Sequence, residues 1–169
     1  MALTDMTRPA GACTEAHLTY TDGSSRTVYC TDVEVPFPDG RLIVSRTDLA
    51  GVITHANDAF VEMSGYARDE LIGAPHHILR HPDMPKVAFK GLWDTIAAGQ
   101  KWHGYVKNLR RDGAFYWVYA TAVPNVRGGR IVGYTSVRRK PSRTRIAELV
   151  PVYRDWLAQE RAASCPSIS

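Results

Sequence analysis

The chain has 169 residues, of which 44% are hydrophobic and 22% charged, a balance that suits one soluble globular domain with room for a tail. Its formal net charge of +4 at pH 7 favours an acidic partner or a phosphate group but does not indicate a nucleic-acid-binding surface. No apolar run is long enough for a secretory signal or a membrane span, so we expect neither.

Residues 1–39 are polar and broken by prolines, and we expect them to form an N-terminal extension or cap. Within this segment, His17 to Cys30 predicts a hairpin that turns at Asp22-Gly23, because Asp-Gly pairs favour tight turns. The compact domain is then expected to cover residues 40–140.

Two strands and two short helices are predicted in the first half of this domain. Asn57 or Asp58 suits the N-cap of the first helix, since either side chain accepts hydrogen bonds from free backbone N–H groups, and Gly65 suits the end of that helix. Three prolines in residues 73–85 exclude a long regular element there. The four predicted elements cover residues 41–46, 52–56, 58–63 and 68–72.

A longer helix and three strands are predicted in the second half. Apolar residues at helical spacing mark the helix over residues 86–98. Short glycine-containing turns join the strands over residues 102–110, 115–126 and 130–139, which predicts an antiparallel meander. This order of elements predicts an α+β fold, namely a five-stranded antiparallel sheet with short helices on one face.

Residues 141–169 are expected to form a C-terminal amphipathic helix and a tail. The helical pattern begins at Arg143, Pro151 either kinks it or starts a second helix, and Ser164 to Ser169 are expected to be disordered. We expect this helix and the N-terminal segment together to form the output surface, and the protein to self-associate through that surface as a homodimer. A basic cluster precedes the helix and either steers an acidic surface or is a solvated turn; it consists of Arg138, Arg139, Lys140, Arg143 and Arg145.

Three segments carry a more specific signal, namely Ile53 to Phe60 (ITHANDAF), Arg80 to Pro85 (RHPDMP) and Gly104 to Asn108 (GYVKN). They resemble the PAS sensor domains of the bacterial aerotaxis receptors (Aer and its relatives), over roughly residues 45–160. In that family the PAS domain binds FAD non-covalently and reports redox state to a chemotaxis signalling module. The resemblance therefore implies a PAS fold, FAD as cofactor and a chemotaxis-type or other signalling partner. Family members usually continue into a membrane anchor, a HAMP linker and a methyl-accepting domain, none of which these 169 residues contain.

The strand over residues 102–110 suggests a ligand pocket by its own composition. Trp102, Gly104 and Asn108 alternate onto one face, and a mid-strand glycine leaves room beside an indole and an amide. Asn108 has the donor and the acceptor to pair with the N3–H and O4 edge of a flavin, and Trp102 suits stacking or a pocket wall. The alternative is a structural tryptophan, a corner glycine and an asparagine bonded to the backbone. The resemblance implies that Trp102 and Asn108 belong to the flavin site.

The proline-broken segment is expected to lie over that pocket. The Arg80 guanidinium matches phosphate oxygens, while His81 and Asp83 either hold the loop or contact ribose and adenine. The alternative is an Asp turn and an arginine in solvent. The resemblance implies that these three residues matter for FAD binding. Asn57 is either a helix cap or a further ligand contact.

The function expected from these residues is a flavin redox or oxygen sensor that signals by a conformational change. The alternatives are a cofactor-free interaction module and a haem-binding gas sensor that uses His76 or His77. No Ser/His/Asp grouping, metal-ligand spacing or phosphate loop is readable, so we expect neither an enzyme nor a metal site.

The cysteines are Cys13, Cys30 and Cys165. All three lie outside residues 40–140, which predicts that no cysteine forms a light-driven adduct with a flavin. Their odd number and the absence of a CxxC pair suit a reducing cytoplasm.

Overall fold

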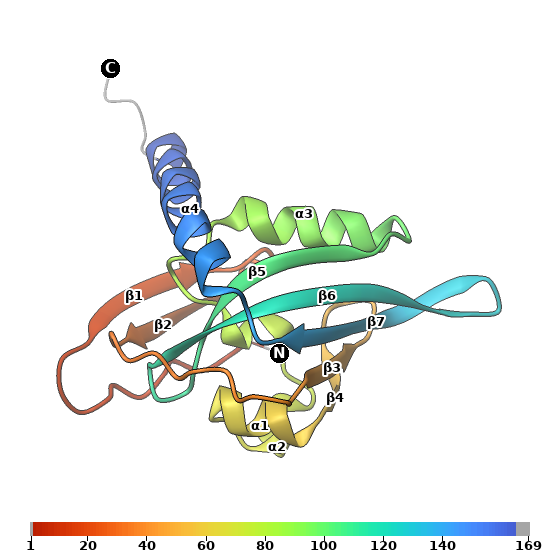
Figure 1. The fold of residues 1–169 in the computed structure, drawn as a ribbon, viewed down its shortest axis with the longest axis horizontal. Helices are drawn as coiled ribbons and strands as arrows, with labels where there is room; N and C mark the ends of the chain where they lie inside the picture. Colours follow the sequence, from red (N-terminus) through yellow and green to blue (C-terminus); the bar gives the residue numbers. More distant parts are fainter. Residues whose placement is uncertain (1, 165–169) are drawn as a thin grey trace.

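The central layer of the molecule is a five-stranded antiparallel sheet with the strand order β4-β3-β7-β6-β5 (Figure 1). The computed structural model describes residues 2–164. β5, β6 and β7 form the predicted meander, and β3 adds to its edge beside β7. The predicted α+β fold is therefore confirmed. The strands are β3 (Ile43–Thr47), β4 (Ile53–Ala56), β5 (Trp102–Leu109), β6 (Phe115–Arg127) and β7 (Arg130–Arg139).

Short helices connect β4 to β5, as the sequence predicts. In the first of them, the Asn57 side chain accepts from the Phe60 N–H at 3.1 Å, and Gly65 ends the helix at a φ of 75°, a conformation that suits glycine. The proline-broken segment holds only one turn of 3₁₀ helix. The helices are α1 (Asp58–Ser64), α2 (Arg68–Leu71), η1 (His76–Leu79) and α3 (Lys86–Ala97).

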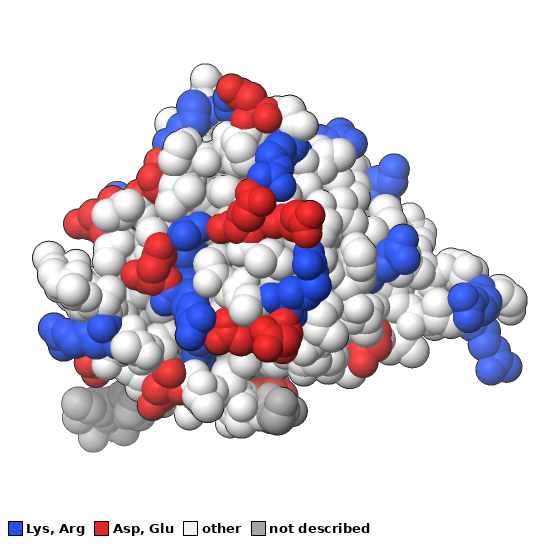
Figure 2. Space-filling view, turned by 90° about the horizontal axis from the view of Figure 1, so that it is seen from below, with Lys and Arg blue, Asp and Glu red and all other residues white. Residues whose placement is uncertain are grey.

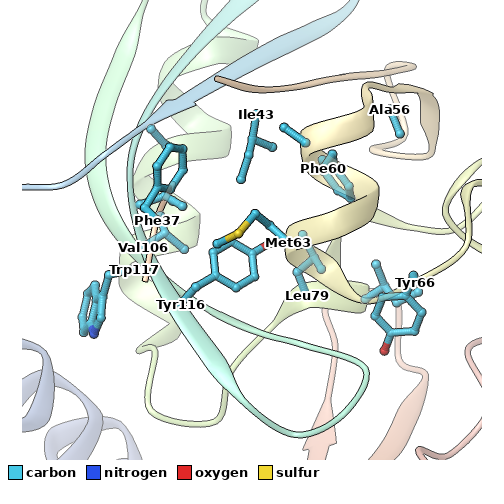
Figure 3. Close-up of a cluster of buried hydrophobic side chains, with 14 of the residues drawn as sticks. Phe37, Ile43, Ala56, Phe60, Met63, Tyr66, Leu79, Val106, Tyr116 and Trp117 are labelled. Carbon is cyan, nitrogen blue, oxygen red and sulfur yellow. The ribbon is translucent and has the colours of Figure 1, made fainter. Parts of the chain in front are cut away.

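Most of the main hydrophobic core lies between α1 and one face of the sheet, which we call the inner face (Figure 3), while Trp117 and Tyr153 extend it on the outer face. Phe60 and Met63 from α1 contact this core, and Tyr116 enters it from β6. A second cluster forms where α3 crosses the other end of the inner face, with Trp93 edge-on to Tyr134. The two clusters hold α1 and α3 apart over the same face.

The N-terminal hairpin is confirmed: β1 (Thr14–Thr19) pairs with β2 (Ser25–Cys30) in antiparallel register. Asp22 organises the turn, because its carboxylate accepts from the Ser24 N–H at 2.9 Å. Strand β1 begins three residues before the predicted hairpin.

A buried arginine anchors this hairpin to the domain. Arg26 on β2 is only 4% exposed. Its Nη1 donates to the Ile78 carbonyl at 3.2 Å and its Nη2 to the Tyr66 hydroxyl at 3.0 Å. Its Nε donates to the Thr4 carbonyl at 2.7 Å. One side chain thus joins η1, the segment after α1 and the start of the chain. The predicted domain boundaries at residues 39/40 and 140/141 stay predictions.

The C-terminal helix α4 (Arg143–Ser164) runs through Pro151 as one element, so of the two alternatives at Pro151 the second helix is wrong. Tyr153 is buried against the outer face of the sheet, where its hydroxyl donates to the Tyr105 carbonyl at 2.8 Å. The predicted apolar stripe thus covers its own sheet in part, while Trp156 remains 38% exposed. The predicted disorder of the last six residues is wrong for Ser164, which is helical, and residues 165–169 lie outside the described part of the chain.

Carboxylates neutralise much of the predicted basic cluster. Arg143 pairs with Glu34, Lys140 with Asp39, and Arg145 with Glu148. On the face shown in Figure 2, Lys and Arg side chains likewise alternate with Asp and Glu. These pairs favour a solvated turn over a surface that steers an acidic partner.

Candidate functional site

A cavity of about 900 Å³ lies between the inner face of the sheet, α3, η1 and the turn of the N-terminal hairpin. Pockets that bind small molecules typically span roughly 300–1,000 Å³. The cavity therefore has the size of a ligand site. Its floor is made by Ser45, Thr47, Val106, Asn108, Ala120, Ala122, Ser136 and Arg138, its apolar roof by Leu79, Phe89, Leu92, Trp93 and Ile96.

Small side chains make this floor flat. Ser45 on β3 pairs with Ser136 on β7, which pairs in turn with Ala122 on β6. Ala120, in the neighbouring row of β6, also lines the floor. Since side chains stand nearly perpendicular to a sheet, a run of small residues across three strands lets a planar group approach the backbone.

A buried arginine occupies one side of the floor. Arg138 is 3% exposed; its Nη2 donates to the Ser45 hydroxyl at 2.9 Å, and its guanidinium lies 4.8 Å from the Phe60 ring centre. Burial lowers the pKa of Arg138 to about 10, so it is charged at neutral pH. Among residues 2–164 no carboxylate forms an ion pair with it, and its Nε has no hydrogen-bond partner. Burying a cation without an anion costs free energy. This side of the floor therefore favours a ligand that brings negative charge or hydrogen-bond acceptors.

His76 supports that arginine. Its Nε2 lies 3.3 Å from Arg138 Nη1 and 3.3 Å from the Ser45 hydroxyl. Burial and the Arg138 charge lower the pKa of His76 to about 3, so the ring is neutral at pH 7 and its Nε2 accepts from the guanidinium. Because this nitrogen is already engaged, the geometry disfavours His76 as an iron ligand.

Two of the predicted ligand residues meet in the cavity. Asn108 is 6% exposed and lines the floor, and Arg80 lines the wall. A backbone bridge joins Arg80 to Asn108, which ties the RHPDMP segment to β5. The Arg80 guanidinium lies 4.9 Å from the Phe89 ring centre, donates to the Met84 carbonyl at 3.3 Å and has a buried Nε without a partner among the described residues.

His81 and Asp83 do not line the cavity; they fix the segment that carries Arg80. The His81 Nδ1 accepts from the Asp83 N–H at 3.0 Å, and the Asp83 carboxylate accepts from Lys107 Nζ at 2.8 Å. Burial lowers the pKa of His81 to about 4, consistent with a neutral ring as acceptor. This geometry corresponds to the loop-holding role considered for the two residues.

Trp102 packs beside the cavity and not in its lining. The indole lies over Gly104, where an added Cβ would be 2.3 Å from the ring atom Cη2. The expectation that Gly104 leaves space for a ligand is therefore wrong, because the room it leaves is filled by the neighbouring indole. Trp102 contacts the second core cluster and supports one end of the floor.

Asn57 also lies outside the cavity. Its Oδ1 accepts from the N–H groups of Val44 and Phe60, at 3.0 and 3.1 Å, and its Nδ2 donates to the Leu42 carbonyl at 2.9 Å. Its amide thus caps α1 and joins it to the start of β3, which is a structural role away from the cavity.

Arg138 and Tyr20 line the cavity although sequence reasoning did not place them there, and His76 lines it although the sequence analysis considered it only as a haem ligand. For Arg138 a signal existed, because the alternation of β7 puts it on the face of Ser136, yet it was grouped with the basic turn. Tyr20 had no local signal, since only the docking of the hairpin brings it to the cavity.

Within residues 2–164, no three side chains of the His, Cys, Asp and Glu types cluster closely enough to hold a metal ion. No helix in this range is both long and apolar enough to cross a membrane.

Comparison with known proteins gives a consistent picture. Residues 53–138 match the family model described as the PAS fold. The chain is 49% identical over 126 residues to the aerotaxis receptor of Escherichia coli K12, a match that covers 75% of this chain and 25% of the receptor. It is 30% identical over 97 residues to a nitrogen fixation regulatory protein of Klebsiella pneumoniae, which covers 57% of this chain and 20% of that protein. The chain thus spans about a quarter or less of the length of these relatives.

Solved structures share the fold. The light-state structure of the blue-light photoreceptor Aureochrome1 LOV superposes with a TM-score of 0.57 at 23% identity, covering 71% of this chain and 91% of that one. At this identity the likeness concerns the fold alone.

Proposed function

The chain belongs to the PAS family, and from that premise we propose that it is a flavin-binding redox or oxygen sensor with FAD as its cofactor. The observation that carries the proposal is Arg138, a buried arginine in the floor of a ligand-sized cavity that forms no ion pair with a carboxylate among residues 2–164. The related aerotaxis receptor is a sensory protein by name, and the LOV neighbour is a photoreceptor.

The residues around the cavity fit an isoalloxazine ring. The flat floor of serine and alanine side chains suits a planar ring system, and the apolar roof of α3 suits its other face. Asn108 offers both a donor and an acceptor to the polar edge of the ring. Arg138 offers donors and a positive charge, which would favour negative charge on the ring.

A bound flavin supplies one- or two-electron redox chemistry, with a change of charge and hydrogen bonding at the ring. Arg138 and Asn108 would respond first, because both lie in the cavity floor. Arg138 is connected through His76 to η1, and Asn108 through its bridge to Arg80 to the segment before α3. A modest shift between two arrangements of these contacts is enough for a signal.

The route from the cavity to α4 passes through Glu160. This residue lines the cavity and also caps α3, where its carboxylate accepts from the N–H groups of Lys86 and Val87 at 3.0 and 2.9 Å. We propose that the C-terminal helix passes the signal to a chemotaxis-type or other signalling partner.

The absorption spectrum of the purified protein tests the function. Flavin bands, with FAD released on denaturation, are the expected result. A Soret band would replace the proposal by a haem sensor. A colourless protein that also refuses added FAD would favour a cofactor-free interaction module.

We propose a homodimer that forms through the exposed part of α4, because Trp156 and Val152 remain in solvent there. Trp156→Lys should yield a monomer in solution with unchanged flavin content. A wild-type monomer, or a variant that stays dimeric, would remove α4 from the dimer interface. We further propose a cytoplasmic location, where Cys13 and Cys30, both free thiols, stay reduced, and a signalling role without enzymatic turnover.

A further inference from the structure

The turn of the N-terminal hairpin and the 73–85 segment together form one wall of the cavity. Tyr20 and Asp22 line it from the hairpin, and His77 and Arg80 line it from the other side. The Tyr20 side chain lies flat on the His77 ring, with ring centres 3.8 Å apart and planes 3° apart, and Tyr20 is 5% exposed. Tyr20 and Asp22 lie outside residues 53–138, which match the PAS family model, so the family match assigns no role to the hairpin side of this wall.

Three polar atoms in this wall are buried and have no hydrogen-bond partner among residues 2–164, namely Tyr20 Oη, His77 Nε2 and Arg80 Nε. The Arg26 guanidinium lies close enough to the Tyr20 hydroxyl to interact with it electrostatically, while the three hydrogen bonds of that guanidinium go to Thr4, Ile78 and Tyr66. Folded proteins satisfy the great majority of their buried polar groups. Three unsatisfied groups in neighbouring residues of one cavity wall therefore indicate that a polar ligand completes them.

The chemistry of the wall selects the class of ligand. Arg80 is a cation that suits a phosphate group. The Tyr20 hydroxyl donates and accepts, and the neutral His77 ring offers one further nitrogen, which suits sugar hydroxyls or a nucleobase. Asp22 at the rim adds a carboxylate acceptor for hydroxyl groups, and Lys86 at the mouth adds a second positive charge. A phosphate joined to a sugar and a base is a nucleotide.

We propose that the β1–β2 hairpin completes the ligand site, and that Tyr20, His77 and Arg80 form a subsite for the nucleotide half of a flavin dinucleotide. The proposal rests on the proposed flavin function and deepens it. The subsite allows the protein to distinguish FAD from FMN and from riboflavin, because among these three only FAD carries an adenosine group. The N-terminal extension is then part of the binding site.

Titration of the flavin-free full chain with riboflavin, FMN and FAD tests the subsite, with flavin fluorescence as the readout. We expect FAD to bind at least about tenfold more tightly than FMN, since two or three hydrogen bonds depend on its nucleotide half. Tyr20→Phe should weaken FAD binding about fivefold and leave riboflavin binding unchanged. It should also raise the Tm of the flavin-free protein by about 2 °C, because it removes an unsatisfied hydroxyl.

Two further variants sharpen the test. His77→Phe keeps the ring stack but removes the unpaired nitrogen, so it should also reduce the preference for FAD over FMN. Tyr29→Phe is the matched control, because Tyr29 lies in the same hairpin but packs in a separate small cluster. It should change neither quantity.

The outcomes separate the two proposals. Equal affinities for FAD and FMN, or an unchanged FAD preference in both Tyr20→Phe and His77→Phe, would overturn the subsite and leave the flavin function intact. If none of the three flavins binds, the flavin function fails, and the subsite fails with it.

Discussion

The hairpin junction contains the buried Arg26, and the cavity floor contains the buried Arg138. The hydrogen bonds of the two guanidinium groups differ. Arg26 and Arg138 are equally buried, at 4% and 3% exposure. All three guanidinium nitrogens of Arg26 donate to protein oxygens, including two carbonyls. Arg138 has one clear acceptor in Ser45, a shared nitrogen in His76 and an Nε with no partner in the described chain.

This difference separates a structural arginine from one that is available to a ligand. A buried cation is stabilising only where its donors are satisfied. Arg26 meets that condition within the folded chain and joins the hairpin to the domain. Arg138 does not, so the protein keeps part of its hydrogen-bonding capacity for another molecule. Burial alone does not tell the two roles apart, whereas a count of acceptors does.

The same substitution at both positions gives the largest expected effects. Arg26→Met should lower the free energy of unfolding by about 3 kcal/mol, because it leaves the Ile78 carbonyl and the Tyr66 hydroxyl without their donor. Urea unfolding measures this loss. Arg145→Met, which removes an exposed arginine paired with Glu148, should cost less than about 0.5 kcal/mol. A similarly small loss at Arg26 would show that it is not an anchor.

Arg138→Met should change the flavin affinity much more than the free energy of unfolding. We expect the free energy of unfolding of the flavin-free protein to stay within about 1 kcal/mol of the wild type, because a buried charge without an anion is removed. Flavin affinity should fall about 30-fold, since a charged donor to the ligand is lost. The comparison fails if this variant loses as much stability as Arg26→Met while it keeps its affinity.

Acid should lower the free energy of unfolding through His76, which contacts Arg138 beside the cavity floor. The pKa of His76 is about 3 in the folded chain, against an ordinary value of 6.5. Between these values the unfolded chain binds a proton that the folded His76 does not, so stability falls as pH drops below 6.5, by up to about 1.4 kcal/mol per pH unit. Burial also lowers the pKa values of His77 and His81, which adds to this slope.

Substitution isolates the contribution of His76. In urea unfolding measured from pH 7 to pH 4.5, His76→Gln should reduce the slope of stability against pH, and Arg26→Met should keep the wild-type slope. An unchanged slope in His76→Gln would mean that burial and the Arg138 charge do not hold this ring neutral in the folded chain.

Asn108→Ala has the smallest expected effect. It should weaken flavin binding about fivefold while the domain still folds, because a neutral amide contributes less than a charged guanidinium. Asn125→Ala is the matched control, since Asn125 lies on β6 and accepts from Thr135. Wild-type affinity and redox response in Asn108→Ala would exclude the amide from the flavin site.

Local patterns predicted the elements well but the cavity only in part. The three meander strands and α3 agree with their predicted bounds within one residue at most positions, because alternation and helical spacing are local signals. Asn108, placed on the pocket face by strand alternation, and Arg80, placed over the pocket with the help of the resemblance, both line the cavity. The space assigned to Gly104 was misjudged, because a strand pattern gives the direction of the Trp102 side chain but not its rotamer.

The cavity wall formed by the hairpin and the 73–85 segment could not be predicted from local patterns, because it depends on a contact between distant parts of the chain. Tyr20 and His77 are 57 positions apart in sequence, and they meet only because the Arg26 anchor docks the hairpin on η1. No periodicity in either segment encodes that contact. The unsatisfied Nε of Arg138 likewise depends on where three neighbouring elements leave no acceptor.

The position of Glu160 has a thermodynamic consequence. Its carboxylate belongs at once to the cavity wall, to the N-terminus of α3 and to α4. If a ligand in the cavity changes how firmly α4 is held, then linkage requires that a protein bound to α4 change the affinity for that ligand by the same factor. A signalling partner that binds α4 would therefore change the affinity of the sensor for the ligand in its cavity.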